Sequence, residues 1–255
     1  MSAPRNASTE IGQRRKYTFR GTDFPSVTTI LKYTPKEWLG AWAAKMVATE
    51  AVMGYEALGL AIAEQGTEAA LRALKRVPWV KRDAAADFGS AKHEVLEALV
   101  AERTIPETVH HREIEQWREL YQPLVEFSEA QVVNTAVGYA GSLDLIAEVY
   151  GRRLLIDLKS SSVLDHVMRM QLAAYRYAEA VFVDDRIVAE MPPVEGCAVL
   201  WIPRDHPQDW QFIEVDAGAE AWRAFLNVKG THDFLRGYEK RAVGELILPR
   251  ALEVA

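Results

Sequence analysis

The chain has 255 residues, of which 49% are hydrophobic and 26% charged, a composition typical of a folded globular protein. Its single cysteine, Cys197, excludes an internal disulfide, a cysteine-based zinc site and a cysteine-held iron–sulfur cluster. The formal net charge of −6 argues against general nucleic-acid binding, because Lys and Arg make the phosphate contacts. There is no apolar run of membrane-spanning length and no signal-peptide core, so we expect a cytoplasmic protein with no membrane partner.

The first third of the chain is predicted to be a tail followed by a helical extension. Residues 1–15 are small, polar and aperiodic, which predicts a disordered tail. The N-terminal helical extension covers residues 16–82 and opens with a short strand at 16–20 and a turn at 21–23. Its expected helices are residues 27–32 with Ser26 as N-cap, residues 36–52, and residues 66–76, closed by Pro78.

The hydrophobic period changes within residues 83–240. Helical spacing predicts helices at 83–103, 108–127, 164–181 and 218–235. Runs of strand type lie at 131–137, 142–149, 153–159, 196–202 and 210–215. This order indicates one α/β domain, with residues 241–255 as a C-terminal tail.

The expected hairpin between the second and third of these strands is the most informative segment. A two-residue turn at Tyr150-Gly151 gives pairs whose residue numbers sum to 301, which places Asp144 opposite Asp157. Opposed side chains have Cβ atoms roughly 4.5–5.5 Å apart, and like charges there are destabilising. The two carboxylates therefore need a proton or a cation between them.

Mg²⁺ suits this pair, because it takes carboxylate oxygens together with waters and substrate phosphate. Lys159 lies two residues beyond Asp157 on the same strand face. An ammonium there can orient a metal-bound water or stabilise developing phosphate charge. The pattern is thus compatible with phosphodiester hydrolysis. The alternative is an ion-pair cluster on a solvated strand face, in which Lys159 neutralises one Asp.

Asp144, Asp157 and Lys159 resemble the signature of the PD-(D/E)XK nuclease superfamily, which is an Asp, a hairpin and then Asp/Glu-x-Lys. Two further segments are similar to motifs of its RecB-like branch: Gly89-Ser-Ala-Lys-His93 to G-x-x-x-H, and Gln171-Leu-Ala-Ala-Tyr175 to Q-x-x-x-Y. Within this branch the chain resembles phage exonucleases and the mitochondrial genome maintenance exonuclease group, through Pro25-Ser-Val-Thr-Thr-Ile-Leu31 as well.

The resemblance implies a restriction-endonuclease-like core, with a central mixed β-sheet flanked by helices, over residues 83–240. It also implies a Mg²⁺- or Mn²⁺-dependent DNA exonuclease without an iron–sulfur cluster, acting on single strands or strand ends. The implied metal ligands are His93, Asp144, Asp157 and the backbone carbonyl of Leu158. Lys159 would position or polarise the attacking water. Gln171 and Tyr175, one helical turn apart, would contact the DNA backbone or hold Lys159.

Several other residues are candidates for weaker roles. Glu129 is either an additional acid of the site or a solvated loop carboxylate. Ser160 and Ser161 either touch a phosphate or end the strand and cap the next helix. A basic segment with a tryptophan suits a single-strand path, where bases stack and phosphates are neutralised, although it also suits a solvated helix end. Its residues are Arg72, Lys75, Arg76, Trp79, Lys81 and Arg82.

Two other functions stay open. The protein is alternatively a catalytically silent DNA-end-binding module, or a structure-specific endonuclease of the same fold. The complete set of Asp144, Asp157 and Lys159 argues against the silent module, which has no need of it. Circular single-stranded DNA separates the other two, because an exonuclease leaves it intact. A recombination or replication protein is the expected further partner.

Overall fold

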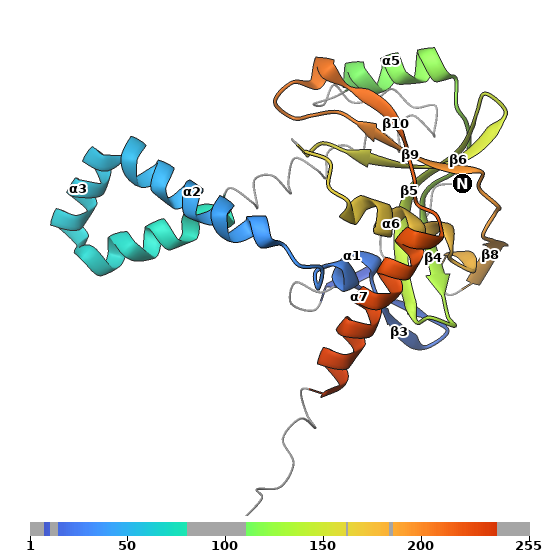
Figure 1. The fold of residues 1–255 in the computed structure, drawn as a ribbon, viewed down its shortest axis with the longest axis horizontal. Coiled ribbons are helices and arrows are strands. Elements are labelled where there is room, and N and C mark those ends of the chain that lie inside the picture. The colour runs from blue at the N-terminus through green and yellow to red at the C-terminus, as the bar shows by residue number, and fades with distance from the viewer. Residues whose placement is uncertain (1–7, 11–14, 81–110, 162, 184–185, 239–255) are drawn as a thin grey trace, which may run out of the picture.

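The computed structural model describes residues 8–10, 15–80, 111–161, 163–183 and 186–238. Its centre is a seven-stranded sheet (Figure 1). The strands are β4 (Leu124–Asn134), β5 (Tyr139–Val149), β6 (Arg152–Lys159), β7 (Ala180–Val183), β8 (Arg186–Glu190), β9 (Gly196–Trp201) and β10 (Gln211–Val215). They lie in the order β10-β9-β6-β5-β4-β7-β8, and only β6 and β9 run parallel.

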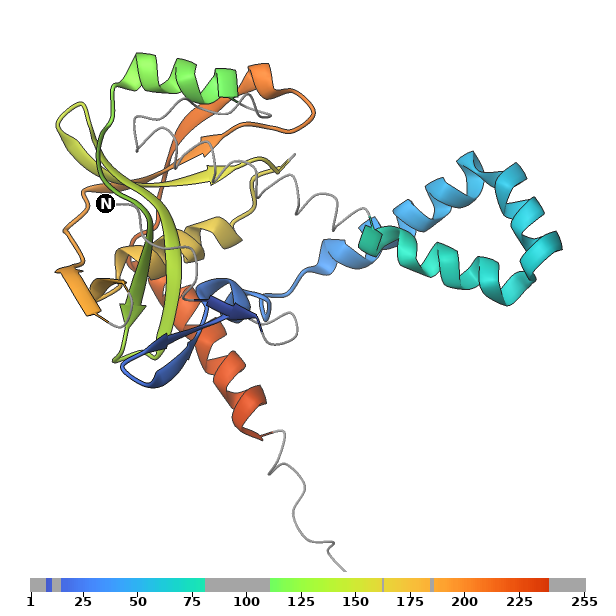
Figure 2. The same cartoon turned by 180° about the vertical axis from the view of Figure 1, so that it is seen from behind.

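Helices cover both faces of this sheet (Figure 2). On one face lie α1 (Val27–Leu31), α6 (Val167–Arg176) and α7 (Ala219–Tyr238), whose apolar side chains share a core with Leu155 of β6. On the other lies α5 (His111–Tyr121), whose Trp117 packs with Leu154 and Ile156. A 3₁₀ turn, η1 (Pro207–Asp209), precedes β10. The expected α/β class, with a central mixed sheet flanked by helices, is therefore confirmed.

The N-terminal part differs from the prediction. Ser8–Glu10 form β1, within the segment expected to be a disordered tail, and β1 pairs with β2 (Arg15–Phe19). β3 (Thr22–Pro25) completes a three-stranded antiparallel sheet. Backbone pairing orders even a polar strand, which composition alone does not reveal. This sheet also packs on the main one, because the ring centroids of Phe19 and Phe182 lie 5.1 Å apart.

The predicted start of α1 is confirmed. The hydroxyl of Ser26 accepts a hydrogen bond from the backbone N–H of Thr29 at 3.0 Å, which satisfies one of the free donors at the helix start. Val27 and Ile30 of this helix are fully buried, and Ser26 forms a parallel bridge with Ala140 of β5. The start of the extension thus belongs to the core of the domain and is not a separate unit.

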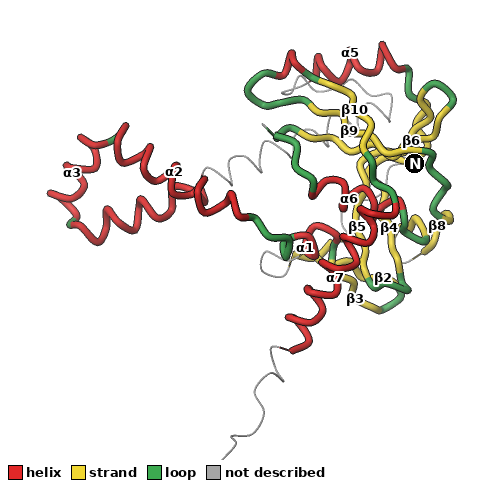
Figure 3. The backbone as a smooth tube through the Cα atoms, in the orientation of Figure 1, coloured by secondary structure: helices red, strands yellow, loops and turns green. Residues whose placement is uncertain are grey.

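The rest of the extension is a helical arm that projects from the body (Figure 3). It consists of α2 (Glu37–Met53), α3 (Tyr55–Gln65) and a helix over residues 67–80. α3 was not predicted, because its apolar residues follow no single stripe, and the last helix continues through Pro78 instead of ending there. Within the described part, no single helix is long and apolar enough to cross a membrane; α2 from Leu39 and α3 pass only as a pair bent by 85°.

Two predicted helices are too long at their C-terminal ends. The helix expected to reach residue 127 ends at Tyr121, and β4 begins at Leu124, because Gln122 has a left-handed backbone with φ of 43°. The helix expected to reach residue 181 ends at Arg176, since β7 pairs with β4 from Ala180. Neither β7 nor β8 was predicted. The helix predicted at 83–103 lies outside the described residues.

Cys197 is buried in β9, and burial raises the pKa of its thiol to about 11. Because the thiolate is the reactive form, we expect the native protein to react with a disulfide reagent at pH 8 about 100-fold more slowly than the unfolded chain. Absorbance of the released thiol, with and without guanidinium, measures both rates. Equal rates would contradict the burial of Cys197.

Candidate functional site

The predicted hairpin turn and register are confirmed. Tyr150 and Gly151 both have left-handed backbones, with φ of 52° and 76°, as a two-residue hairpin turn with two positive φ values requires. The paired residues sum to 301 from Val149–Arg152 to Leu145–Ile156. The Tyr150 hydroxyl donates a 2.8 Å hydrogen bond to the Leu120 carbonyl, which helps to hold a tyrosine in this unusual position.

The side chain of Arg153 forms its ion pair with Glu126, not with its cross-strand neighbour Glu148. Arg153 lies opposite Glu148, as the register predicts. Its guanidinium nevertheless forms an ion pair with Glu126 of β4, with 2.7 Å between Nε and Oε1. β4 lies beyond β5 from β6, and the β4–β5 register shifts between Val125 and Phe127, so this ion pair spans β5 beside an irregularity at Glu126.

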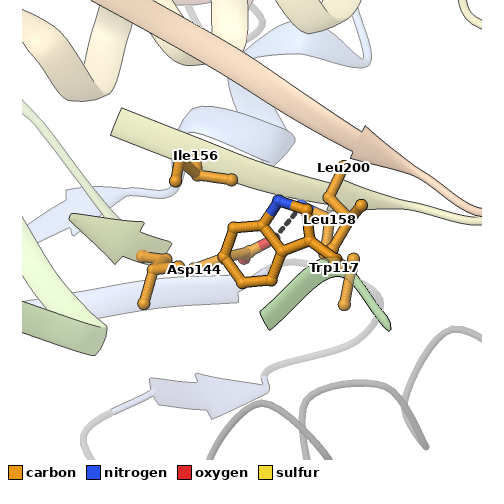
Figure 4. A pocket seen from close by; sticks show the side chains of 6 residues that line it. Trp117, Asp144, Ile156, Leu158 and Leu200 are labelled. Atoms are coloured by element: carbon orange, nitrogen blue, oxygen red, sulfur yellow. Dashed lines mark hydrogen bonds between the residues drawn. The ribbon is translucent and has the colours of Figure 1, made fainter. Parts of the chain in front are cut away.

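Beyond Leu145 the structure differs from a simple hairpin, because the paired register stops before it reaches Asp144 and Asp157. The Asp144 carboxylate instead accepts a 2.8 Å hydrogen bond from the backbone N–H of Leu158 (Figure 4). A side-chain oxygen thus serves as a partner for β6 where the cross-strand pairs with β5 have ended. Asp144 is thereby attached to the residue whose carbonyl is an expected metal ligand.

Asp157 and Lys159 form an ion pair, with 2.7 Å between Nζ and Oδ2, as the alternative interpretation of this strand face predicted. The solvated face that the alternative also assumed is wrong, because Asp144 is only 8% exposed and Asp157 only 2%. Burial opposes the charge on Lys159, but the carboxylates of Asp157 and then Asp144 outweigh this effect and raise its pKa. The ammonium is therefore charged at neutral pH.

Gln171 and Tyr175 of α6 lie beside this pair. The Lys159 ammonium donates a 3.1 Å hydrogen bond to Oε1 of Gln171. The Gln171 amide in turn donates to the Tyr175 hydroxyl at 3.3 Å. Burial raises the pKa of Tyr175 well above its ordinary value, so the phenol is neutral. Of the two roles expected for Gln171, this geometry favours holding Lys159.

Glu129 lies within β4, and not in a loop as one of its two expected roles assumed. The pairs Ser128–Leu145 and Ala130–Leu143 flank it, so the register places Glu129 across from Asp144 on β4. Its backbone is left-handed, with φ of 49°. A non-glycine residue in this region is strained, and such strain is often found at functional sites.

The two serines after Lys159 are placed differently from each other. Ser160 is buried at the end of β6, whereas Ser161 is exposed. The carbonyl of Ser161 accepts a 2.7 Å hydrogen bond from the indole of Trp201, which holds the chain as it leaves the strand. Both serines come directly after Lys159 in the chain, next to the Asp157–Lys159 ion pair.

The structure does not bring the basic segment to the carboxylates. Its described members lie on the helix over residues 67–80, in the arm that projects from the sheet (Figure 1). These members are Arg72, Lys75, Arg76 and Trp79. The other predicted contacts, Lys81 and Arg82, and the predicted metal ligand His93 lie outside the described residues.

Trp117 of α5 is a neighbour of Asp144 that the sequence did not reveal. Its indole forms one wall of a small pocket, and among the described residues that line this pocket Asp144 is the only charged one (Figure 4). The remaining lining residues are Leu145, Ile156, Leu158 and Leu200. The indole nitrogen is buried and has no hydrogen-bond partner within the described part of the chain. The amphipathic pattern of α5 marks Trp117 as buried, but nothing in it indicates Asp144 as a neighbour.

The donors at this site fit a hard divalent cation. Asp144, Asp157 and the Leu158 carbonyl offer only oxygen, which Mg²⁺ and Mn²⁺ prefer. The described residues contain no group of three or more His, Cys, Asp or Glu side chains placed to hold a metal ion. Two carboxylates are nevertheless sufficient for Mg²⁺, which keeps several waters and takes substrate phosphate oxygens.

Comparisons with known proteins show no family for this chain. No protein-family model matches it, and no curated protein does. Among solved structures, the crystal structure of SSO0001 is similar over 82% of this chain and 83% of that one. The two share 14% sequence identity, and the TM-score is 0.34.

Proposed function

We propose that this protein is a Mg²⁺- or Mn²⁺-dependent DNA exonuclease with a PD-(D/E)XK core. The observation that carries the proposal is the partly buried Asp157–Lys159 ion pair near the end of β6, beside the buried carboxylate of Asp144. A buried ion pair contributes little net stability, because desolvation offsets the attraction. Two buried acids, one in the middle of β5 and one near the end of β6, together with a lysine therefore point to chemistry.

The residues of the site would have two roles, metal binding and orientation of the attacking water. Asp144, Asp157 and the Leu158 carbonyl would hold the metal, with His93 as the further ligand that the motif implies. When bound, the metal supplies Lewis-acid polarisation and an acidified water. The charged ammonium of Lys159, held by Gln171, orients the attacking water or stabilises charge that develops on the phosphate.

The remaining parts of the proposal concern DNA and its surroundings. Ser160 and Ser161 would contact phosphate next to the site, and Glu129 would add an acid. The basic helix of the arm would bind single-stranded DNA through Arg72, Lys75, Arg76 and Trp79, together with Lys81 and Arg82. We also propose a cytoplasmic location and a recombination or replication protein as partner.

Digestion of labelled DNA tests this function. We expect linear single strands labelled at the 5′ or 3′ end to be degraded, circular single strands to survive, and a chelator to stop the reaction. Excess Mg²⁺ or Mn²⁺ should restore it. Gel electrophoresis of time points gives rate, end requirement and polarity together.

The same experiment separates the alternatives. Cleavage of the circle would make the protein an endonuclease of the same fold. A gel shift of linear DNA without degradation, in either metal, would make it a DNA-end-binding module. Degradation that is unaffected by the chelator would contradict the metal-dependent mechanism.

A further inference from the structure

Gly141 of β5 lies three residues before Asp144 and is buried. A Cβ atom built on it would lie 2.6 Å from Cε1 of Tyr175 and 3.3 Å from Cγ2 of Val27. The first distance is shorter than real Cβ contacts. The backbone of Gly141 is not left-handed, so this glycine is not required for conformation. A glycine inside a strand weakens it, and close approach of another group is a usual reason for its presence.

The Tyr175 ring has no room to move away. Its side chain is almost fully buried, with 3% exposed, and packs in the core formed by α1, α6 and the sheet. The hydroxyl of Tyr139 donates a 2.6 Å hydrogen bond to the Ala174 carbonyl, which attaches α6 to β5 one residue before Tyr175. A side chain at position 141 would therefore displace the ring or α6 itself.

We propose that Gly141 is a positioning residue for Lys159, an inference that rests on the proposed nuclease function. The absence of a side chain lets the Tyr175 ring lie directly against β5. The Tyr175 hydroxyl then meets Gln171, and Gln171 holds the ammonium that pairs with Asp157. A backbone contact on one strand thus fixes a lysine on the next through two side chains of α6.

Kinetics of five variants test this connection: G141A, Y175F, Y175L, the double variant G141A/Y175L, and G230A as a matched control. Gly230 lies in α7, and a Cβ there meets nothing within 4 Å. We expect G141A to lower kcat about 10- to 100-fold with little change in KM, because sub-ångström to 1 Å displacements have effects of this size. Y175F keeps the ring and should lower kcat by a smaller factor, and G230A should behave as the wild type.

The double variant separates positioning from general damage. In the Y175L background the ring is absent, so adding G141A should change kcat less than about twofold. Losses that multiply in the double variant would overturn the proposal, as would a wild-type kcat in Y175F. If thermal melting shows that G141A does not fold, the double variant decides the question: it lacks the ring that a Cβ at position 141 would meet, so its folding supports the contact and its failure to fold overturns it.

An activity-independent measurement keeps this inference distinct from the nuclease assignment. The rate at which the Lys159 amine is acylated at a fixed pH, followed by mass spectrometry of its peptide, should rise in G141A and Y175F but not in G230A. If the wild type cleaves no DNA, the proposed function fails, and the acylation rates still test the connection. Unchanged rates in both variants would overturn it.

Discussion

Replacing Lys159 with methionine should lower the rate of DNA cleavage by about 100- to 1,000-fold, the loss typical of removing one charge-stabilising donor. Methionine keeps most of the apolar stem but removes the ammonium that lies 2.7 Å from Asp157. Asp157→Ala should be at least as damaging, because it removes both a proposed metal ligand and the ion-pair partner of Lys159. Single-turnover digestion of an end-labelled strand measures the effect.

The chain offers a matched control for this experiment. Lys229 of α7 also forms a short ion pair, 2.5 Å from Asp233, and its side chain is even less exposed than that of Lys159. Lys229→Met removes a comparable buried ammonium away from the proposed site. Equal loss of cleavage in both variants would show that destabilisation, and not chemistry, causes it. Full activity of Lys159→Met, with the protein folded, would exclude the proposed mechanism.

The sequence was informative where the determinants are local. The turn at Tyr150-Gly151 and the alternation of the flanking residues were sufficient to predict the register between β5 and β6. The spacing of Gln171 and Tyr175 likewise predicted a shared helix face. In each case, residues close in sequence determine the geometry.

Contacts between distant elements were not accessible in this way. The alternation placed Asp144 opposite Asp157, but the recorded pairs end at Leu145, and the carboxylate bonds to the Leu158 N–H instead. No periodic pattern in the sequence predicts that Trp117 lies beside Asp144 or that the Tyr175 ring packs against Gly141. Gly141 interrupts a strand of larger residues, which marks a close approach without identifying the neighbour.

The acidic net charge has a different meaning if the proposed site binds a metal ion. Whole-chain charge counts Asp144 and Asp157 as two negative charges, whereas a bound divalent cation would balance them. The ammonium of Lys159 lies among these carboxylates, so the local balance at the site differs from the chain average. A charge of −6 therefore argues against broad affinity for duplex DNA, but not against a local metal-dependent site.

Asp144 allows stability and catalysis to be separated, because its carboxylate has two tasks. One oxygen accepts the hydrogen bond from the Leu158 N–H, and the charge would bind metal. Asp144→Asn can keep the acceptor but removes the charge, so we expect cleavage to be lost while the free energy of unfolding changes little. Asp144→Ala should also be inactive. It should in addition lower the free energy of unfolding by about 1–3 kcal/mol, since it leaves a buried N–H without a partner.

Chemical denaturation of the wild type and both variants, beside the digestion assay, measures the two effects separately. If the alanine variant is as stable as the asparagine variant, the Asp144–Leu158 hydrogen bond contributes nothing and another interaction holds the middle of β5 to the end of β6. If the asparagine variant cleaves DNA at the wild-type rate, the negative charge is unnecessary and Asp144 is a structural residue. Loss of cleavage in both variants, with loss of stability only in the alanine variant, requires that one side chain performs both tasks.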